Sequence, residues 1–207
     1  MKQLLSILCC LPCFVMAQIN AVTEEGYQIQ VFDDGTWKYI DTTLNEKRFI
    51  KENKSVFQVP ENSKFNVSSK VVNIKIMLDQ DEWYFMPTPK SDVSEFTFNN
   101  KSEEIYGIVI SEKAQIPLEN LRNIALVNAR DNVENLKLIE EEYRFVNNIK
   151  VLYLSFEGEV ESMPLVYNNY YYSEEDGIVQ FVTYAQKDIA ANNKDLMFDL
   201  LNGFTKN

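Results

Sequence analysis

The sequence of 207 residues contains no histidine, and its three cysteines, Cys9, Cys10 and Cys13, all stand near the N-terminus. Without histidine the chain can form neither a Ser-His-Asp triad nor an imidazole proton shuttle. A zinc site built from cysteine and histidine and a Cys-His nucleophile are excluded as well. The six glycines are too scattered for a phosphate-binding loop or a dinucleotide fingerprint. Carboxylates, lysines and hydroxyls remain for catalysis, and we expect neither a metal site nor a cofactor.

Positive charge is also scarce, because 20 Lys and Arg residues face 31 Asp and Glu residues, for a net charge of −11. Proteins that bind nucleic acid carry basic patches, and anionic lipid surfaces attract basic segments. We therefore expect no nucleic-acid partner and no simple electrostatic docking to anionic lipid.

Residues 1–17, MKQLLSILCCLPCFVMA, have the pattern of a secretory signal peptide. Lys2 is followed by an apolar stretch that is too short to span a bilayer, and Ala17 ends a cleavage site. A buried first helix is the alternative, which Pro12 disfavours. No cysteine follows a small residue, as lipid attachment would require. We expect cleavage after Ala17, a secreted or periplasmic protein without a lipid or a transmembrane segment, and a mature chain without disulfides.

The stretch VFDDGTWKYI, residues 31–40, predicts a β-hairpin, because Asp-Gly separates two stretches of alternating apolar residues. It resembles a short Asp-Gly-Thr-Trp hairpin unit found near the N-terminus of many secreted bacterial proteins. A two-stranded hairpin is marginally stable alone, so Trp37 and Tyr39 need a cover from the domain, a partner or the cell envelope. We interpret residues 18–41 as an adaptor hairpin, with Trp37 and Tyr39 as partner-binding residues.

Residues 42–67 are mostly polar, and their apolar residues come singly and without a period. This pattern predicts a linker or a loosely docked arm, since it is too long for an ordinary loop inside a compact domain. A folded domain is expected from residue 68 to residue 207.

Within that domain the pattern predicts strands at 72–78, 95–98 and 105–111, a helix from Pro117 to about Arg130, and a last helix at 194–202. Four strands in succession are predicted between these helices, at 136–146, 150–160, 164–172 and 178–186. The last of them is apolar on both faces, so both faces of the sheet require a cover. The predicted fold class is α+β: a mainly antiparallel sheet with helices on both faces, an α/β/α sandwich.

Five segments in this order resemble the PsbP-like superfamily, which includes photosystem oxygen-evolution subunits and many bacterial envelope proteins. They are the strand that leads to Asp-Glu-Trp83, IPLENLRNIALVNAR (116–130), VNNIKVLYLSFEGEV (146–160), YNNYYYSEEDGIVQFVTYA (167–185) and DLMFDLLNGF (195–204). The resemblance implies a fold, and assembly and binding roles without a shared set of catalytic residues.

Two acidic clusters are candidates for chemistry. Glu140-Glu141-Glu142 could supply a general acid and base only if two of its carboxylates converged in a cleft. The alternation of a strand instead predicts an ion-paired or solvated face that Glu140 and Glu142 share with Arg144.

The second acidic cluster is Asp79, Asp81 and Glu82, whose spacing loosely resembles that of calcium ligands. An EF-hand loop needs Gly at its sixth position and Glu at its twelfth, which here are Tyr84 and Lys90. The EF-hand is therefore excluded, and a surface cation at this cluster stays open.

Tyrosines crowd the strand that begins at Tyr167, where Tyr170 and Tyr172 share one face and Tyr171 takes the other. Packing inside a sheet that is covered on both faces is one interpretation. If a tyrosine face is exposed, Tyr170 and Tyr172 are the partner-binding candidates, since tyrosine combines a large ring with a polar tip.

These patterns favour a non-catalytic exported envelope protein with a partner-binding or assembly role, acting through its PsbP-like domain. Its expected partner is a protein of the cell envelope. The alternative is a carboxylate-based hydrolase of glycans, because glycosidases need only two carboxyl groups about 5–10 Å apart. A deep pocket with two close acidic side chains would favour the hydrolase, and a flat patch bearing tyrosine or tryptophan would favour binding.

Overall fold

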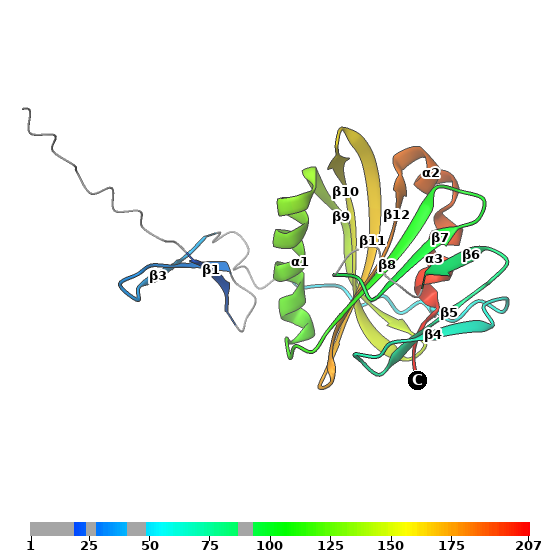
Figure 1. Ribbon diagram of the computed structural model, residues 1–207, viewed down its shortest axis with the longest axis horizontal. Helices are drawn as coiled ribbons and strands as arrows, with labels where there is room; N and C mark the ends of the chain where they lie inside the picture. Colours follow the sequence, from blue (N-terminus) through cyan, green and yellow to red (C-terminus); the bar gives the residue numbers. More distant parts are fainter. Residues whose placement is uncertain (1–18, 24–27, 41–48, 87–92) are drawn as a thin grey trace, which may run out of the picture.

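The structure is a computed structural model that describes residues 19–23, 28–40, 49–86 and 93–207. Within these ranges the strands form a three-stranded N-terminal sheet, a seven-stranded central sheet and a second three-stranded sheet (Figure 1). No helix of the described residues is long and apolar enough to cross a membrane. The predicted signal peptide, residues 1–17, lies outside the described residues.

The N-terminal sheet contains β1 (Ile19–Val22), β2 (Gln28–Val31) and β3 (Trp37–Tyr39), paired antiparallel in that order. Gly35 lies in the turn between β2 and β3 with a φ of +79°, a conformation that favours glycine. One carboxylate oxygen of Asp34 accepts hydrogen bonds from the backbone N–H and the hydroxyl of Thr36. The predicted hairpin therefore gains β1 as a third strand.

The central sheet is antiparallel throughout, in the order β6-β7-β8-β12-β11-β10-β9. Its strands are β6 (Trp83–Met86), β7 (Phe96–Asn100), β8 (Ile105–Glu112), β9 (Glu134–Val146), β10 (Ile149–Val160), β11 (Met163–Glu174) and β12 (Gly177–Gln186). The last four strands agree with the sequence prediction to within two residues at each end.

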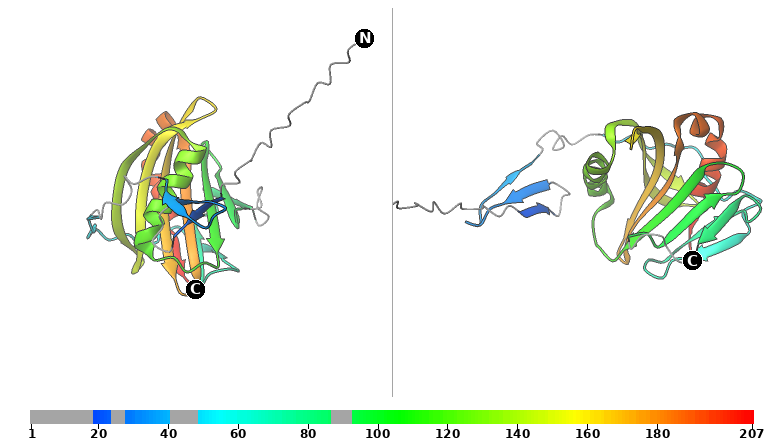
Figure 2. Two further views of the ribbon diagram at one scale, coloured as in Figure 1. Left: turned by 90° about the vertical axis from the view of Figure 1, so that its left-hand side faces the viewer. Right: turned by 45° about the horizontal axis from the view of Figure 1, so that its top comes forward.

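Different elements cover the two faces of the central sheet, as Figures 1 and 2 show. On one face lies α1 (Leu118–Asn132). On the other lie α2 (Lys187–Asn192), α3 (Lys194–Asn202) and the second three-stranded sheet, formed by β4 (Phe65–Ser68), β5 (Ile74–Leu78) and β13 (Phe204–Lys206). Each face carries its own apolar core. The predicted antiparallel sheet with helices on both faces is confirmed.

Gly203 is the C-terminal cap of α3 with a φ of −67°, so no left-handed backbone requires glycine there. The need for glycine comes from a close approach instead. A Cβ at this position would lie 1.9 Å from the carbonyl oxygen of Met77. The backbone carbonyl of Gly203 accepts a hydrogen bond from the N–H of Met77, which joins the end of α3 to β5.

Residues 49–59, here called the edge arm, run parallel to β9 at the edge of the central sheet. Tyr143 donates its N–H to the carbonyl of Lys51 and accepts at its own carbonyl from the N–H of Asn53. The backbone carbonyl of Phe57 accepts a hydrogen bond from the N–H of Asn147. The edge arm thus contacts the domain directly, and β4 begins at Phe65, inside the range predicted as linker. The division at residue 68 stays a prediction.

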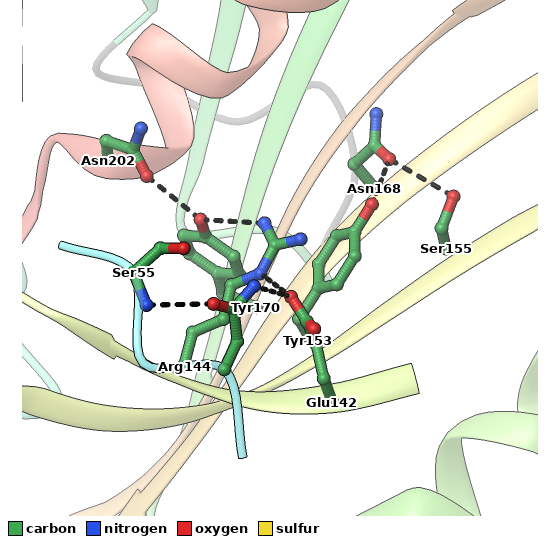
Figure 3. A network of polar contacts seen from close by, with 9 residues as sticks. Ser55, Glu142, Arg144, Tyr153, Ser155, Asn168, Tyr170 and Asn202 are labelled. Carbon is green, nitrogen blue, oxygen red and sulfur yellow. Dashed lines mark hydrogen bonds and ion pairs between the residues drawn. The ribbon is translucent and has the colours of Figure 1, made fainter. Parts of the chain in front are cut away.

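A buried ion pair fixes the edge arm to the core (Figure 3). Glu142 and Arg144 are each 5% exposed, and Arg144 Nε donates to Glu142 Oε1 at 2.6 Å. The same oxygen accepts from the side-chain amide of Asn53 at 2.8 Å. The guanidinium lies 3.5 Å from the ring centre of Tyr153 and 4.7 Å from that of Phe57. Hydrogen bonds and ring faces thereby offset the desolvation of the pair.

Tyr170 extends this network to α3, because its hydroxyl donates to Asn202 Oδ1 at 2.9 Å and accepts from Arg144 at 3.4 Å. Tyr153 donates to Asn168 Oδ1 at 2.9 Å, and Ser155 donates to the same oxygen. Burial raises the pKa of Tyr153 to about 12, and burial also raises the pKa of Tyr170. Both hydroxyls therefore stay protonated as hydrogen-bond donors.

We predict that a protein beginning at Phe49 unfolds with the same free energy as the mature chain, whereas one beginning at Phe65 loses about 3 kcal/mol. The second deletion removes a hydrogen bond to a buried carboxylate and the cover of Phe57. Urea unfolding followed by circular dichroism measures both values. Asn53→Ala should reproduce part of the loss, and Lys54→Ala, at the next and exposed position of the edge arm, should not. Equal stability of the two truncated proteins would contradict the docking of the edge arm.

We further predict that stability falls as the pH rises from about 10 toward about 12. Tyr153 ionises near 10.0 in the unfolded chain and at about 12 in the folded protein, so its contribution is complete below 10 and is lost across this window. Urea unfolding at several alkaline pH values should show that the free energy of unfolding falls less steeply with pH in Tyr153→Phe than in the unmodified protein. Tyr84→Phe, a change at an exposed ring, should show the same pH dependence as the unmodified protein. If Tyr153→Phe also showed that pH dependence, Tyr153 would not be the cause of the alkaline loss of stability.

Candidate functional site

Trp37 and Tyr39, predicted to bind a partner, lie side by side on β3 of the N-terminal sheet. Their rings meet edge to face with centres 5.2 Å apart. Trp37 is 54% exposed and Tyr39 is 38% exposed. The pair therefore offers aromatic surface to solvent, and its role in binding stays a prediction.

Tyr170 and Tyr172, the other two predicted partner-binding residues, are only 1% and 2% exposed. The ring of Tyr172 lies 5.4 Å from that of Phe204, and the hydroxyl of Tyr170 belongs to the Arg144 network. Their face of the sheet is covered by α3 and the second three-stranded sheet, so neither ring reaches a surface where a partner could touch it. Packing inside a doubly covered sheet, the other interpretation of the sequence, describes their environment.

The acidic run on β9 forms ion pairs on both faces of its strand. Glu142 pairs with Arg144 on one face, and Glu141 pairs with Arg122 of α1 at 2.5 Å on the other. This is the alternation that the sequence predicted. These carboxylates hold β9 against its neighbours and do not converge in a cleft.

The second acidic cluster borders a recess of about 180 Å³ that Asp79, Glu82 and Asp199 line together with Asn62 and Trp83. The carboxylate of Asp79 accepts from the side chain of Asn62 at 2.7 Å and from a backbone N–H of the following turn at 2.8 Å. Burial raises the pKa of Asp199, and a neighbouring aspartate adds to the rise.

This recess is smaller than the roughly 300–1,000 Å³ of ordinary small-molecule sites. In the described ranges no group of three or more His, Cys, Asp or Glu residues is arranged to hold a metal ion. The recess therefore gives a glycan no room, and the carboxylate of Asp79 already holds the turn.

A larger cavity of about 580 Å³ lies between α1 and the central sheet, and we call it the α1 cavity. Among the residues that the structure describes, its lining contains no Asp, Glu, Lys or Arg. The lining residues come from α1 and the position after it, from the five strands β8 to β12 and from one loop position: Val93, Ile108, Ile110, Ala125, Asn128, Ala129, Asn132, Val133, Leu136, Phe156, Val160, Leu165, Tyr167, Asn169, Tyr171, Gln180, Val182 and Tyr184.

The cavity exists because one helix cannot cover the whole face. Strands lie about 4.8 Å apart and a helix is about 10 Å wide, so α1 spans roughly two or three strands. It contacts β9, β10 and β11. Apolar side chains farther across the sheet, such as Ile108 and Ile110 on β8, remain half-buried at the cavity.

Three polar side chains stand together on the wall of the α1 cavity. The side-chain nitrogen of Gln180 donates to Asn169 Oδ1 at 3.1 Å and to the hydroxyl of Tyr171 at 3.0 Å. The amide nitrogen of Asn169 donates to the carbonyl of Leu154. Burial raises the pKa of Tyr171 well above its usual range, so its hydroxyl stays protonated. The hydroxyl proton of Tyr171 and the side-chain oxygen of Gln180 have no hydrogen-bond partner among the described residues.

A row of stacked tyrosines crosses the same face of the sheet. The ring centres of Tyr106 and Tyr184 lie 5.3 Å apart, and those of Tyr184 and Tyr167 lie 5.7 Å apart. Register places these residues opposite one another on β8, β12 and β11. Sequence reasoning missed both the row and the cavity, because the adjacency of β8 and β12 depends on pairing across the intervening strands.

No family model and no curated protein matches the chain. Among solved structures it is similar to the cyanobacterial PsbP protein CyanoP of Synechocystis sp. PCC 6803, with a TM-score of 0.51 and 14% identity over 72% of this chain and 95% of that one. LpqN of Mycobacterium tuberculosis, described as involved in cell envelope biogenesis, gives a TM-score of 0.46 and 10% identity over 68% and 88%.

PA94 of Pseudomonas aeruginosa, a protein of unknown function, gives a TM-score of 0.44 and 10% identity over 67% of this chain and 93% of that one. At such low identity the likeness to CyanoP concerns the fold alone. The likeness covers most of both chains, and the chain has the PsbP-like fold.

Proposed function

We propose that this is a non-catalytic exported protein of the cell envelope that binds a protein partner or supports an assembly. Its PsbP-like domain is the functional body, and the N-terminal sheet is its adaptor. Export rests on the signal-peptide pattern of residues 1–17. The exposed pair of Trp37 and Tyr39 carries the proposal of binding.

The N-terminal sheet supports this role because it is too small to bury its own aromatic rings. Its strands are three or four residues long, and none of its described side chains is buried. Small sheets need a packed hydrophobic face for independent stability. A partner that covers Trp37 and Tyr39 would supply that face, and exposed aromatic rings are typical anchors of protein interfaces.

The alternative of a carboxylate-based hydrolase lacks a suitable site in the described residues. The α1 cavity has the size for a ligand but no ionisable carboxyl or amine in its lining. The recess beside Asp79 has carboxylates but too little room. The exposed rings of Trp37 and Tyr39 support binding instead.

We predict that Trp37→Ala weakens binding to the partner by about 2–4 kcal/mol, the usual scale for truncating a buried aromatic anchor. The partner is first isolated by affinity capture from the cell envelope of the source organism and identified by mass spectrometry. The dissociation constants of the purified pair are then measured by calorimetry. Tyr84→Ala, which removes an exposed ring from β6, is the matched control and should leave the affinity unchanged.

Tryptophan fluorescence gives an independent readout, because the chain has only two tryptophans and Trp83 is already buried. Partner binding should shift the emission of Trp37 to shorter wavelength and protect it from a soluble quencher. The thermal unfolding of the domain should be the same in Trp37→Ala. Equal affinity of Trp37→Ala and the unmodified protein, with Trp37 still open to quencher in the complex, would overturn the proposal.

A further inference from the structure

The α1 cavity has the features of a small-molecule site, which goes beyond partner binding by the N-terminal sheet. Its volume of about 580 Å³ falls within the roughly 300–1,000 Å³ of ordinary ligand sites. Most of its wall is apolar, and a few polar groups are gathered at one place. This combination of an apolar wall and convergent polar groups is typical of sites that orient a bound molecule.

The lining selects against charge. None of the described side chains that line it can neutralise an anion or a cation, and the chain as a whole carries a net charge of −11. Moving an ionised group from water into an apolar site without a counter-charge is strongly unfavourable. The ligand class that fits this wall is therefore uncharged.

The polar groups define what the ligand carries. Tyr171 has a hydroxyl proton to donate, and Gln180 has an amide oxygen to accept, within the described residues. The 3.0 Å hydrogen bond between their side chains places the two groups next to each other. A hydroxyl both accepts and donates, so one alcohol group satisfies both at once.

We propose that the α1 cavity binds an uncharged, mostly apolar alcohol, with its hydroxyl between Tyr171 and Gln180. The apolar part lies along the wall formed by side chains such as Ile108 and Leu165. The stacked rings of Tyr167 and Tyr184 border the same space and offer a flat contact for a chain or a ring. Ala129 of α1 lines the cavity from the opposite side.

The test uses the full mature chain and decan-1-ol as the probe, with decanoate as a charged molecule of the same chain length. Binding is followed by displacement of the neutral dye N-phenyl-1-naphthylamine at neutral pH. Decan-1-ol should displace the dye in a saturable manner, and decanoate should bind at least about tenfold more weakly. Equal displacement by both, or no dye binding and no displacement, overturns the proposal.

Two pairs of variants locate the site. Ala129→Trp fills the cavity and should abolish dye and alcohol binding, whereas Ala191→Trp, the same change on the exposed side of α2, should leave both unchanged. Circular dichroism checks that each variant is folded, and Ala129→Leu serves if the larger residue prevents folding. Retained binding in a folded, filled variant overturns the assignment of the cavity.

Tyr171→Phe keeps the shape of the wall and removes the hydroxyl proton. Decan-1-ol affinity should fall about tenfold, the upper range for one neutral hydrogen bond, while dye affinity stays nearly the same. An equal loss for both molecules would show a structural effect on the cavity, and no loss for decan-1-ol would show that its hydroxyl lies elsewhere. Either result overturns the placement between Tyr171 and Gln180.

Discussion

The central sheet is apolar on both faces, and the need to cover both faces governs the rest of the structure. Seven strands at about 4.8 Å spacing make a surface roughly 30 Å wide, several times what one helix can cover. On one face α2, α3 and the second three-stranded sheet share the task. On the other face α1 is the one helix among the described elements. The buried tyrosines of one face and the α1 cavity of the other are two outcomes of the same constraint.

The two faces also divide the polar chemistry. The fully covered face contains the buried pair of Glu142 and Arg144, which is held by aromatic rings and by the edge arm. Each charge of such a pair depends on the other, because removing one partner leaves a buried charge uncompensated. On the incompletely covered face, the polar side chains among the described residues of the α1 cavity are neutral amides and hydroxyls. Neutral polar groups can line a cavity whether it holds water or a ligand, since either can complete their hydrogen bonds.

The sequence predicted most features that depend on neighbouring residues. Pro117 marked the start of α1, and alternation located the strands from β9 to β12. Features that depend on distant pairing escaped it: β13 beside β5, the edge arm beside β9, and β8 beside β12. Tyr170 shows the limit, because alternation places it on one face with Tyr172 but does not say how that face is covered. The sequence could not predict the α1 cavity either, because alternation does not show how much of a face a helix covers.

A chain that keeps apolar surface open must avoid association with itself. The exposed rings of the N-terminal sheet and the partly covered wall of the α1 cavity would each favour contact between copies. Two copies that each carry a net charge of −11 repel one another, whereas a neutral ligand or a partner of opposite charge does not meet this barrier. The acidic composition thus opposes association between copies through this apolar surface.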